Sequence, residues 1–182
     1  MTPDRQINDC IAYFNGEMGR NLLFVSLPEQ RLYLFKSRQL QKDYSVSTSA
    51  RGAGCKNGSY QTPYGLHEIK EKIGSGADAG EVFTARKPQG RRMHIEQGAV
   101  NTGVDAITSR ILWLSGLEPG VNRGRDMDSY KRYIYIHGTH EEGLIGQPVS
   151  MGCIRMTNKD VIELFDEVSE GDYVYIMDES NE

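Results

Sequence analysis

The sequence predicts a mainly β protein, a sandwich or small barrel of short strands, with one helix near each end of the chain. Short apolar runs broken by turn residues occupy much of the chain from residue 21 onward. Helical apolar spacing stands out in two places. The 182 residues, 38% hydrophobic and 25% charged, fit a single domain, residues 1–182, with one core.

The first helix is expected over residues 1–16, with Thr2 as its cap, Pro3 at its first position and Gly16 at its end. Its apolar face carries Ile7, Cys10, Ile11 and Phe14. The apolar runs then predict strands at residues 22–27, 31–36, 39–47, 65–73, 82–86, 110–114, 133–137 and 173–177.

The second helix follows residue 156. Thr157 and Asp160 have capping-box spacing, and Gly171 is expected to end the helix. Its apolar side carries Val161, Leu164, Phe165 and Val168. Three polar or glycine-rich stretches, residues 50–61, 87–103 and 116–129, are long enough to be binding loops.

The net charge and the cysteine content indicate which binding partners and which cellular compartment to expect. A formal charge of −4, from 21 Lys and Arg against 25 Asp and Glu, disfavours nucleic acid or an anionic membrane as partner. The first thirty residues have no signal-peptide pattern and no membrane span. Three cysteines at no metal-like spacing favour free thiols in a reducing compartment. A cytoplasmic location is expected, and export after removal of a leader is the alternative.

The stretch from His137 to Met156 carries the chemistry. A strand ending in Tyr-Ile-Tyr-Ile-His places His137 where a sheet meets a loop. A thiol attacks carbonyls as thiolate, and His137 is the imidazole available to activate Cys153. Gly152 permits a tight turn, so that amides around Gly152 and Cys153 converge on one oxygen as an oxyanion hole.

Arg155 is the candidate substrate anchor. In an extended segment it lies on the same face as Cys153, two positions away. Its planar charge suits bidentate binding of a substrate carboxylate, and a structural ion pair is the alternative.

The region from His137 onward contains His137-Gly-Thr, a loop with Ile-Gly, the run Ser-x-Gly-Cys-Ile-Arg-Met and the run x-Asn-x-Asp-Val-Ile-Glu-Leu. On these motifs the region resembles the L,D-transpeptidase catalytic-domain family (YkuD-type). Thr62-Pro-Tyr-Gly-Leu-His-Glu-Ile69 resembles that family's Thr-Pro-x-Gly-x-x-x-Ile strand start, and the match covers residues 20–178. Many members carry histidine where this chain has Met151.

The resemblance implies a β-rich fold that cleaves the bond between an L-centre, usually of diaminopimelate, and the terminal D-alanine of peptidoglycan tetrapeptides. It implies a thioacyl-enzyme on Cys153, His137 as general base and acid, and backbone donation near Gly152. It also implies supporting, substrate-binding roles for Ser150 and Arg155. Gly138, beside the histidine, is counted among the substrate-binding residues.

Several residues keep two interpretations. His67, in the strand after the Thr-Pro turn, either lines the substrate groove or packs in the interior. His140 is expected in solvent, and a metal site built from it with His137, Cys153 and Glu141 or Glu142 is the alternative. The clusters Arg86-Lys87, Arg91-Arg92 and Arg123-Arg125 either attract substrate carboxylates or are solvated loop charges. No metal or organic cofactor is required.

The thioester intermediate leaves the acceptor open, because water and an amine attack the same group. The expected activity is an L,D-carboxypeptidase that releases terminal D-alanine from muropeptides in murein recycling. An L,D-transpeptidase that forms peptidoglycan cross-links is the alternative, and a non-catalytic muropeptide-binding domain is the second. The sequence does not identify the group that orients His137, which in relatives is often a backbone carbonyl, nor the oligomeric state.

Overall fold

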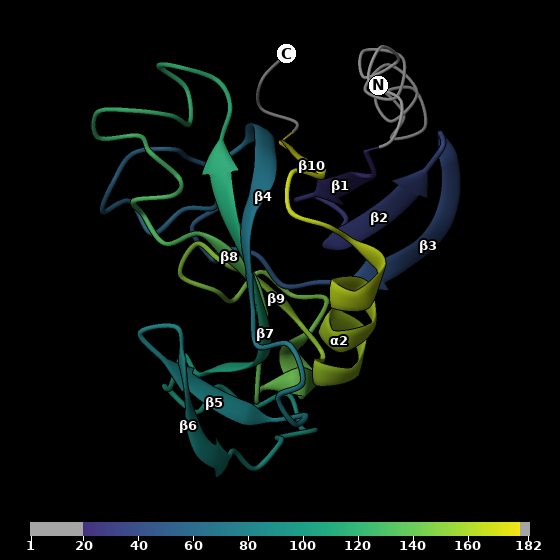
Figure 1. Ribbon diagram of the computed structural model, residues 1–182. Helices are drawn as coiled ribbons and strands as arrows, with labels where there is room; N and C mark the ends of the chain where they lie inside the picture. The colour runs from purple at the N-terminus through teal and green to yellow at the C-terminus, as the bar shows by residue number, and fades with distance from the viewer. Residues whose placement is uncertain (1–19, 179–182) are drawn as a thin grey trace.

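The computed structural model describes residues 20–178 (Figure 1). It confirms the predicted mainly β architecture with a capped helix after Cys153. Within the described residues ten strands form one open sheet in the order β3-β2-β1-β10-β4-β7-β5-β6, with β8 attached to β7 and β9 attached to β8. The helix predicted over residues 1–16 lies outside the described residues. No helix in the described part of the chain has the length and apolar character needed to cross a membrane.

The elements in chain order are β1 (Leu22–Ser26), β2 (Arg31–Lys36), β3 (Gln39–Ser45), β4 (Gly65–Ile73), β5 (Glu81–Thr84), β6 (Lys87–Arg92), β7 (Ile107–Gly116), β8 (Tyr135–Gly138), the 3-10 turn η1 (Glu142–Leu144), β9 (Ile154–Met156), α2 (Asn158–Glu167) and β10 (Tyr173–Met177). The bounds of β2, β4 and β10 agree with the predicted strands. Two strands, β6 and β9, were not predicted.

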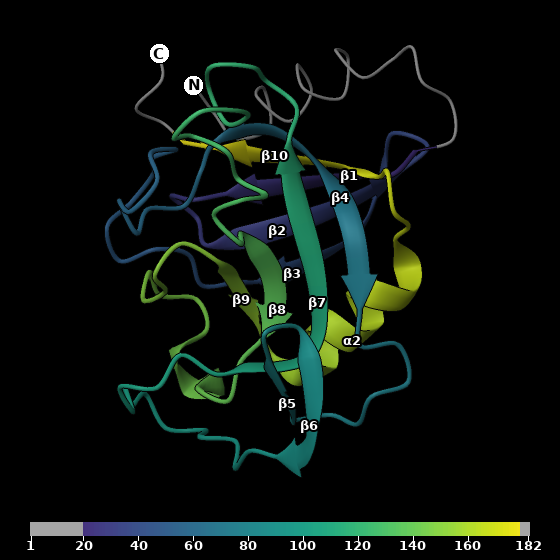
Figure 2. The same cartoon turned by 60° about the vertical axis from the view of Figure 1, so that its left-hand side comes forward.

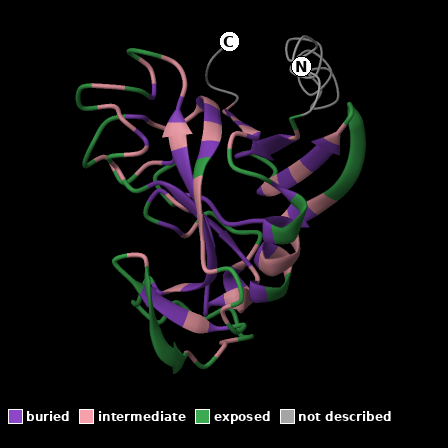
Figure 3. Cartoon of the chain, in the orientation of Figure 1, coloured by how far each residue is buried: buried purple, intermediate pink, exposed green. Residues whose placement is uncertain are grey.

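The sheet is strongly bent, so that β1, β2, β3 and β10 run across β7, β8 and β9 (Figure 2). A single large core fills the space between these two parts, and α2 closes it on one side. Its members include Leu23, Val25, Leu32, Leu34, Leu112, Leu114, Ile136, Ile154, Val161, Leu164 and Phe165. Burial follows this arrangement, since the central strands are buried while β6 and most of β3 are exposed (Figure 3).

Helix α2 begins as predicted and ends earlier than predicted. The Thr157 side chain accepts a hydrogen bond from the Asp160 amide at 3.1 Å. The helix ends at Glu167, before Gly171, because Val168 turns to an extended conformation and its side chain enters the core. The Lys72 ammonium donates to the carbonyls of Phe165 and Val168 at 2.6 and 2.5 Å, which satisfies two of the open carbonyls at the helix end.

Candidate active site

Three neighbouring strands place the predicted chemical residues on one face of the sheet. β8 pairs antiparallel with β7, with His137 opposite Ile111, and parallel with β9, with His137 opposite Arg155. Paired residues point to the same face and neighbours along a strand alternate. Because Ile136 and Ile154 face the main core, His137 and Arg155 project from the other face, as Tyr135 does. Cys153 lies just before β9 and packs against the side-chain cluster that contains Tyr135.

The sulfur of Cys153 lies at the N-terminal edge of β8. It accepts a hydrogen bond from the Tyr135 amide and donates one to the Tyr133 carbonyl, both at 3.4 Å. Burial raises the pKa of the Cys153 thiol to about 12, and the Tyr135 amide and the charge of Arg155 only partly oppose this. The thiol is therefore protonated at neutral pH in the free protein.

The His137 ring is buried and its orientation is fixed by its own strand. Nδ1 lies 2.7 Å from the Gly138 carbonyl oxygen. Because a carbonyl can only accept, Nδ1 carries the proton and Nε2 presents its lone pair, the tautomer required of a general base. Burial lowers the pKa of His137, so the imidazole is neutral at neutral pH. The orienting group that the sequence left open is thus a backbone carbonyl.

The turn that presents the thiol is held by Ser150. Its hydroxyl accepts a hydrogen bond from the Gly152 amide at 3.2 Å and donates to the Cys153 carbonyl at 2.5 Å. The Gly152 amide is therefore occupied, which corrects the expectation that it forms the oxyanion hole. Among residues 20–178 the Cys153 amide has no acceptor, which leaves it as the available donor for an oxyanion.

The backbone conformation and the close packing at position 152 require glycine. Its φ of 126° is a conformation that side chains disfavour, and a Cβ would lie 3.2 Å from the Gln61 carbonyl oxygen. The glycine therefore shapes the loop that carries the nucleophile.

Arg155 makes two ion pairs within the protein. Its terminal nitrogens contact Asp105 at 2.6 Å and Glu141 at 2.9 Å, and its side chain is 6% exposed. This is the structural ion pair that the sequence left as an alternative to substrate binding. Asp105 also lies close enough to His137 to raise its pKa, against the larger effect of burial. The sequence predicts neither of these ion pairs, because each carboxylate meets Arg155 only through the fold.

Comparison with known proteins agrees with this geometry. The family model described as L,D-transpeptidase catalytic domain (YkuD) matches residues 20–176. The chain belongs to the L,D-transpeptidase catalytic domain family. Two Bacillus subtilis proteins that bear L,D-transpeptidase names are similar: YkuD is 54% identical over 46 residues, 25% of this chain and 28% of its own length. YqjB is 35% identical over 97 residues, 53% of this chain and 47% of its own length.

Solved L,D-transpeptidases share the fold at low sequence identity. One from Mycobacterium smegmatis has a TM-score of 0.54 at 14% identity, covering 87% of this chain and 59% of that chain. One from Enterococcus faecium has a TM-score of 0.53 at 14% identity, covering 88% of this chain and 50% of that chain. The match therefore spans about half of the length of these relatives.

Within this L,D-transpeptidase domain, Gly138 is buried and positions the base. A Cβ on Gly138 would lie 2.6 Å from the Thr108 carbonyl oxygen and 2.9 Å from the Asn158 side-chain oxygen. Its own carbonyl holds His137. The structure thus places Gly138 in contact with His137, where a substrate contact was predicted.

We expect Gly138→Ala to lower the free energy of unfolding by about 1–3 kcal/mol, because the methyl group has no space between β7 and α2. Activity should fall further than stability explains, since the displaced carbonyl no longer orients His137. Urea unfolding and kcat/KM measure the two effects. Gly98→Ala is the control, because the nearest atom to its Cβ is the end of the flexible Glu96 side chain. Full activity in folded Gly138→Ala would contradict the orienting role.

The groove interpretation of His67 is wrong. The side chain is fully buried, Nδ1 contacts the Gly65 carbonyl at 3.0 Å and Nε2 contacts the Ser129 hydroxyl at 2.9 Å. Burial lowers the pKa of His67 to about 4. A neutral histidine with both nitrogens paired in the interior joins β4 to the loop before β8 and does not reach a substrate.

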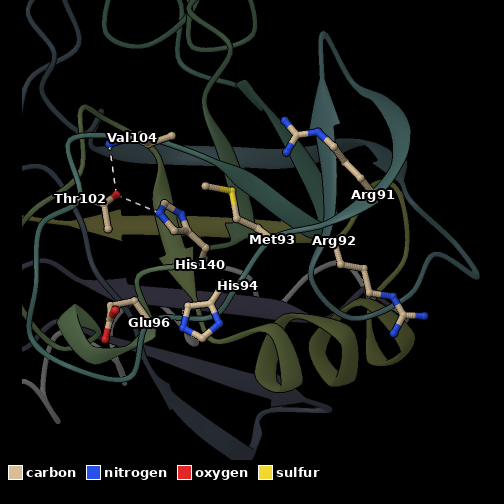
Figure 4. A pocket seen from close by; sticks show the side chains of 8 residues that line it. All are labelled: Arg91, Arg92, Met93, His94, Glu96, Thr102, Val104 and His140. Carbon is tan, nitrogen blue, oxygen red and sulfur yellow. Dashed lines mark hydrogen bonds between the residues drawn. The ribbon is translucent and has the colours of Figure 1, made fainter.

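His140 is also buried, at 3% exposure, where a solvated residue was expected. It lines a cavity of about 380 Å³ together with Arg91 and Arg92 at the end of β6 and His94 of the segment that follows (Figure 4). Its Nε2 contacts the Thr102 hydroxyl at 2.9 Å, and Thr102 in turn donates to Glu141 at 2.8 Å. This network continues to Arg155, so the cavity wall and the ion pairs beside His137 are connected.

Loss of the Arg155 guanidinium should destabilise the fold. Arg155→Gln leaves Glu141 and Asp105 without their cation, and we expect the free energy of unfolding to fall by about 3 kcal/mol. Arg31→Gln, which breaks an exposed ion pair with Asp43, should cost less than about 1 kcal/mol. Urea denaturation of both variants measures the difference. Equal and small effects would contradict a structural role for Arg155.

The lowered pKa of His137 predicts the acidic side of the pH profile of kcat/KM. His137 must be neutral to act as a base. Because its pKa lies below the ordinary histidine pKa of about 6.5, the ring stays neutral until the pH falls to that lowered pKa. We expect kcat/KM to persist through neutral and mildly acidic pH and to fall only as the pH drops through this lowered pKa. A pH titration of kcat/KM measures it. An acidic limb centred at or above pH 6.5 would contradict the buried, neutral imidazole.

Proposed function

We propose that this domain cleaves the bond between the L-centre of the third residue and the terminal D-alanine of peptidoglycan tetrapeptides through a thioacyl-enzyme on Cys153. One observation carries the proposal: in an L,D-transpeptidase-family domain, the Cys153 sulfur contacts the first residue of β8, the same strand that carries a His137 fixed in its base tautomer. The assay must also determine whether the third residue of the preferred tetrapeptide is diaminopimelate or lysine.

The first half-reaction uses the residues as follows. His137 Nε2 takes the thiol proton as the sulfur attacks the carbonyl carbon, so thiolate forms only during attack. The Cys153 amide donates to the developing oxyanion. The carbon–nitrogen bond then breaks, the imidazolium returns its proton to the leaving amine, and D-alanine departs from the thioester.

Water is the acceptor that we propose for the second half-reaction, which makes the domain an L,D-carboxypeptidase. His137 takes a proton from water as the oxygen attacks the thioester carbon. The carbon–sulfur bond then breaks, the tripeptide acid leaves, and the imidazolium returns its proton to the Cys153 sulfur. The net charge of −4 supports this choice, because an acidic protein is not drawn to an anionic wall polymer and meets small muropeptides more readily. A cytoplasmic role in murein recycling belongs to the same proposal, and cell fractionation tests it.

Transpeptidation is the second candidate, favoured by the names of the relatives. An amine on another stem would attack the same thioester and form a cross-link. The catalytic residues are the same for both acceptors, so product analysis must separate them.

The decisive experiment incubates a purified disaccharide-tetrapeptide with the protein, with and without added D-methionine, and analyses the products by mass spectrometry. Loss of one alanine without dimers or exchange supports hydrolysis. Dimers, or replacement of the terminal alanine by methionine, would make the domain a transpeptidase. No change in any product, together with binding of the muropeptide, would support the non-catalytic binding module.

A covalent probe separates enzyme from binder independently. The L,D-transpeptidase LdtMt1, which matches with a TM-score of 0.52, was solved in complex with imipenem. We expect imipenem to add its mass to this chain at Cys153. A folded, muropeptide-binding protein that imipenem leaves unmodified would favour the binding module.

A further inference from the structure

Arg86 lies in the tight turn between β5 and β6. Ala85 and Arg86 both adopt left-handed conformations, with φ of 47° and 66°, which suits a two-residue hairpin turn. The turn carries the guanidinium over a group of aromatic side chains beside the nucleophile. Its central carbon lies 4.8 Å from the Trp113 ring centroid and 5.2 Å from that of Tyr133.

The aromatic side chains under Arg86 pack on one another. Trp113 stacks on Tyr130 at 4.1 Å and meets Tyr135 edge-on at 5.5 Å. One terminal nitrogen of Arg86 donates to the Tyr135 hydroxyl at 3.3 Å. The guanidinium is thus held on a fixed surface, and little side-chain freedom remains to be lost when a ligand binds.

This surface adjoins the reacting sulfur. The Cys153 side chain packs against the same cluster that contains Trp113 and Tyr135. Tyr135 links the two sites directly, because its amide donates to the Cys153 sulfur while its hydroxyl accepts from Arg86. Arg86 therefore lies one tyrosine side chain from the nucleophile, within reach of a group on a residue that flanks the scissile bond.

Arg86 forms no ion pair with a carboxylate among the described residues, in contrast to other arginines of the site and hairpin. Glu71, which accepts from the Tyr130 hydroxyl, acts on the Arg86 charge only from beyond ion-pair distance. Arg155 has two carboxylates, and Arg92, on the same hairpin as Arg86, pairs with Asp78. Among residues 20–178 no carboxylate lies within ion-pair distance of Arg86. Of the five donors of a guanidinium, one is used by Tyr135, so a planar anion can still be bound by two parallel hydrogen bonds.

We propose that Arg86 is a specificity-determining residue that binds a carboxylate of the acyl-donor peptide beside Cys153. The inference rests on the proposed function, because it assumes that a peptide stem occupies this face. Two carboxylates flank the scissile bond of such a stem. One is the terminal carboxylate of the leaving D-alanine, and the other is the side-chain carboxylate of a diaminopimelate third residue.

Amidated substrates distinguish these two sources. We compare the wild-type domain, Arg86→Gln and Arg86→Lys on three tetrapeptides: one with both carboxylates free, one with a terminal amide and one with an amidated side chain on the third residue. On the free substrate we expect Arg86→Gln to lower kcat/KM by about tenfold to a hundredfold, mostly through KM, the effect of removing one charged hydrogen-bonding group. Arg86→Lys should recover part of this loss.

The loss should disappear on the one substrate whose recognised carboxylate is already an amide. Lys87→Gln is the control, because it removes an exposed positive charge from the same hairpin and should leave all three values unchanged. Thermal unfolding of each variant excludes loss of fold. If Arg86→Gln has no effect, or the same effect on all three tetrapeptides, Arg86 is a packing residue and the inference is wrong.

A binding measurement separates this failure from failure of the proposed function. Calorimetric titration of the free tetrapeptide into Cys153→Ala, with and without Arg86→Gln, needs no turnover. Weaker binding with Arg86→Gln would sustain the carboxylate site even if the wild-type domain cleaved none of the tetrapeptides. Equal binding by both proteins would overturn it.

Discussion

We expect Cys153→Ala to abolish tetrapeptide cleavage and to leave the fold intact. Alanine has no nucleophilic group, so the variant cannot form the acyl-enzyme at this position. The fold should survive because Cys153 is only partly buried and its sulfur makes two long contacts, at 3.4 Å, to the Tyr135 amide of β8 and to the Tyr133 carbonyl in the loop before β8. Mass spectrometry of the products measures cleavage, and thermal unfolding measures the stability of the fold.

Cys55→Ala is the matched control. Cys55 is a buried free cysteine in the described part of the chain, with its sulfur 3.8 Å from the Tyr64 carbonyl. Burial raises the pKa of its thiol as well, so its chemistry is similar and only its place differs. Residual cleavage in Cys153→Ala, or equal loss in both variants, would contradict the assignment of the nucleophile.

His137→Asn should lower the rate of acylation by about a hundredfold to ten-thousandfold at neutral pH, the range for loss of a general base. The effect is large here because the thiol of Cys153 has its pKa raised to about 12 and does not ionise without a base. Single-turnover release of D-alanine measures the rate. His94→Gln, at an exposed histidine in the segment after β6, should behave as the wild type.

The pH dependence of this variant gives an independent test. Without a base, only the ionised thiol attacks, so the residual rate of His137→Asn should keep rising with pH toward the pKa of Cys153. The wild-type rate should instead reach a plateau once the imidazole is neutral. Parallel profiles for the two proteins would show that His137 does not deprotonate the thiol.

The strands with clear apolar runs could be predicted from the sequence, and the two polar or short strands could not. β6 reads Lys-Pro-Gln-Gly-Arg-Arg, and its residues are all exposed, so it has no apolar alternation to detect. β9 has three residues and forms only because its pairing with β8 and the bridge from Ser47 to Arg155 hold it. Both depend on partners that are distant in the sequence.

The same limit applies to the site. The motif indicated Cys153 and His137, whose roles remain to be tested by the variants above. The partners of Arg155, the placement of Arg86 over Trp113 and the burial of His67 follow from contacts between segments that are far apart in the chain. The occupied Gly152 amide depends on the side chain of Ser150, a local contact that glycine spacing alone does not reveal.

The most direct test of the central claim is capture of the acyl-enzyme. The protein is mixed with tetrapeptide, quenched in acid within the first turnover, digested and analysed by mass spectrometry. The account predicts the peptide containing Cys153 with the added mass of the tripeptide acyl group, absent in Cys153→Ala. Cleavage of the substrate with no adduct at any time, or with an adduct on another residue, would contradict it.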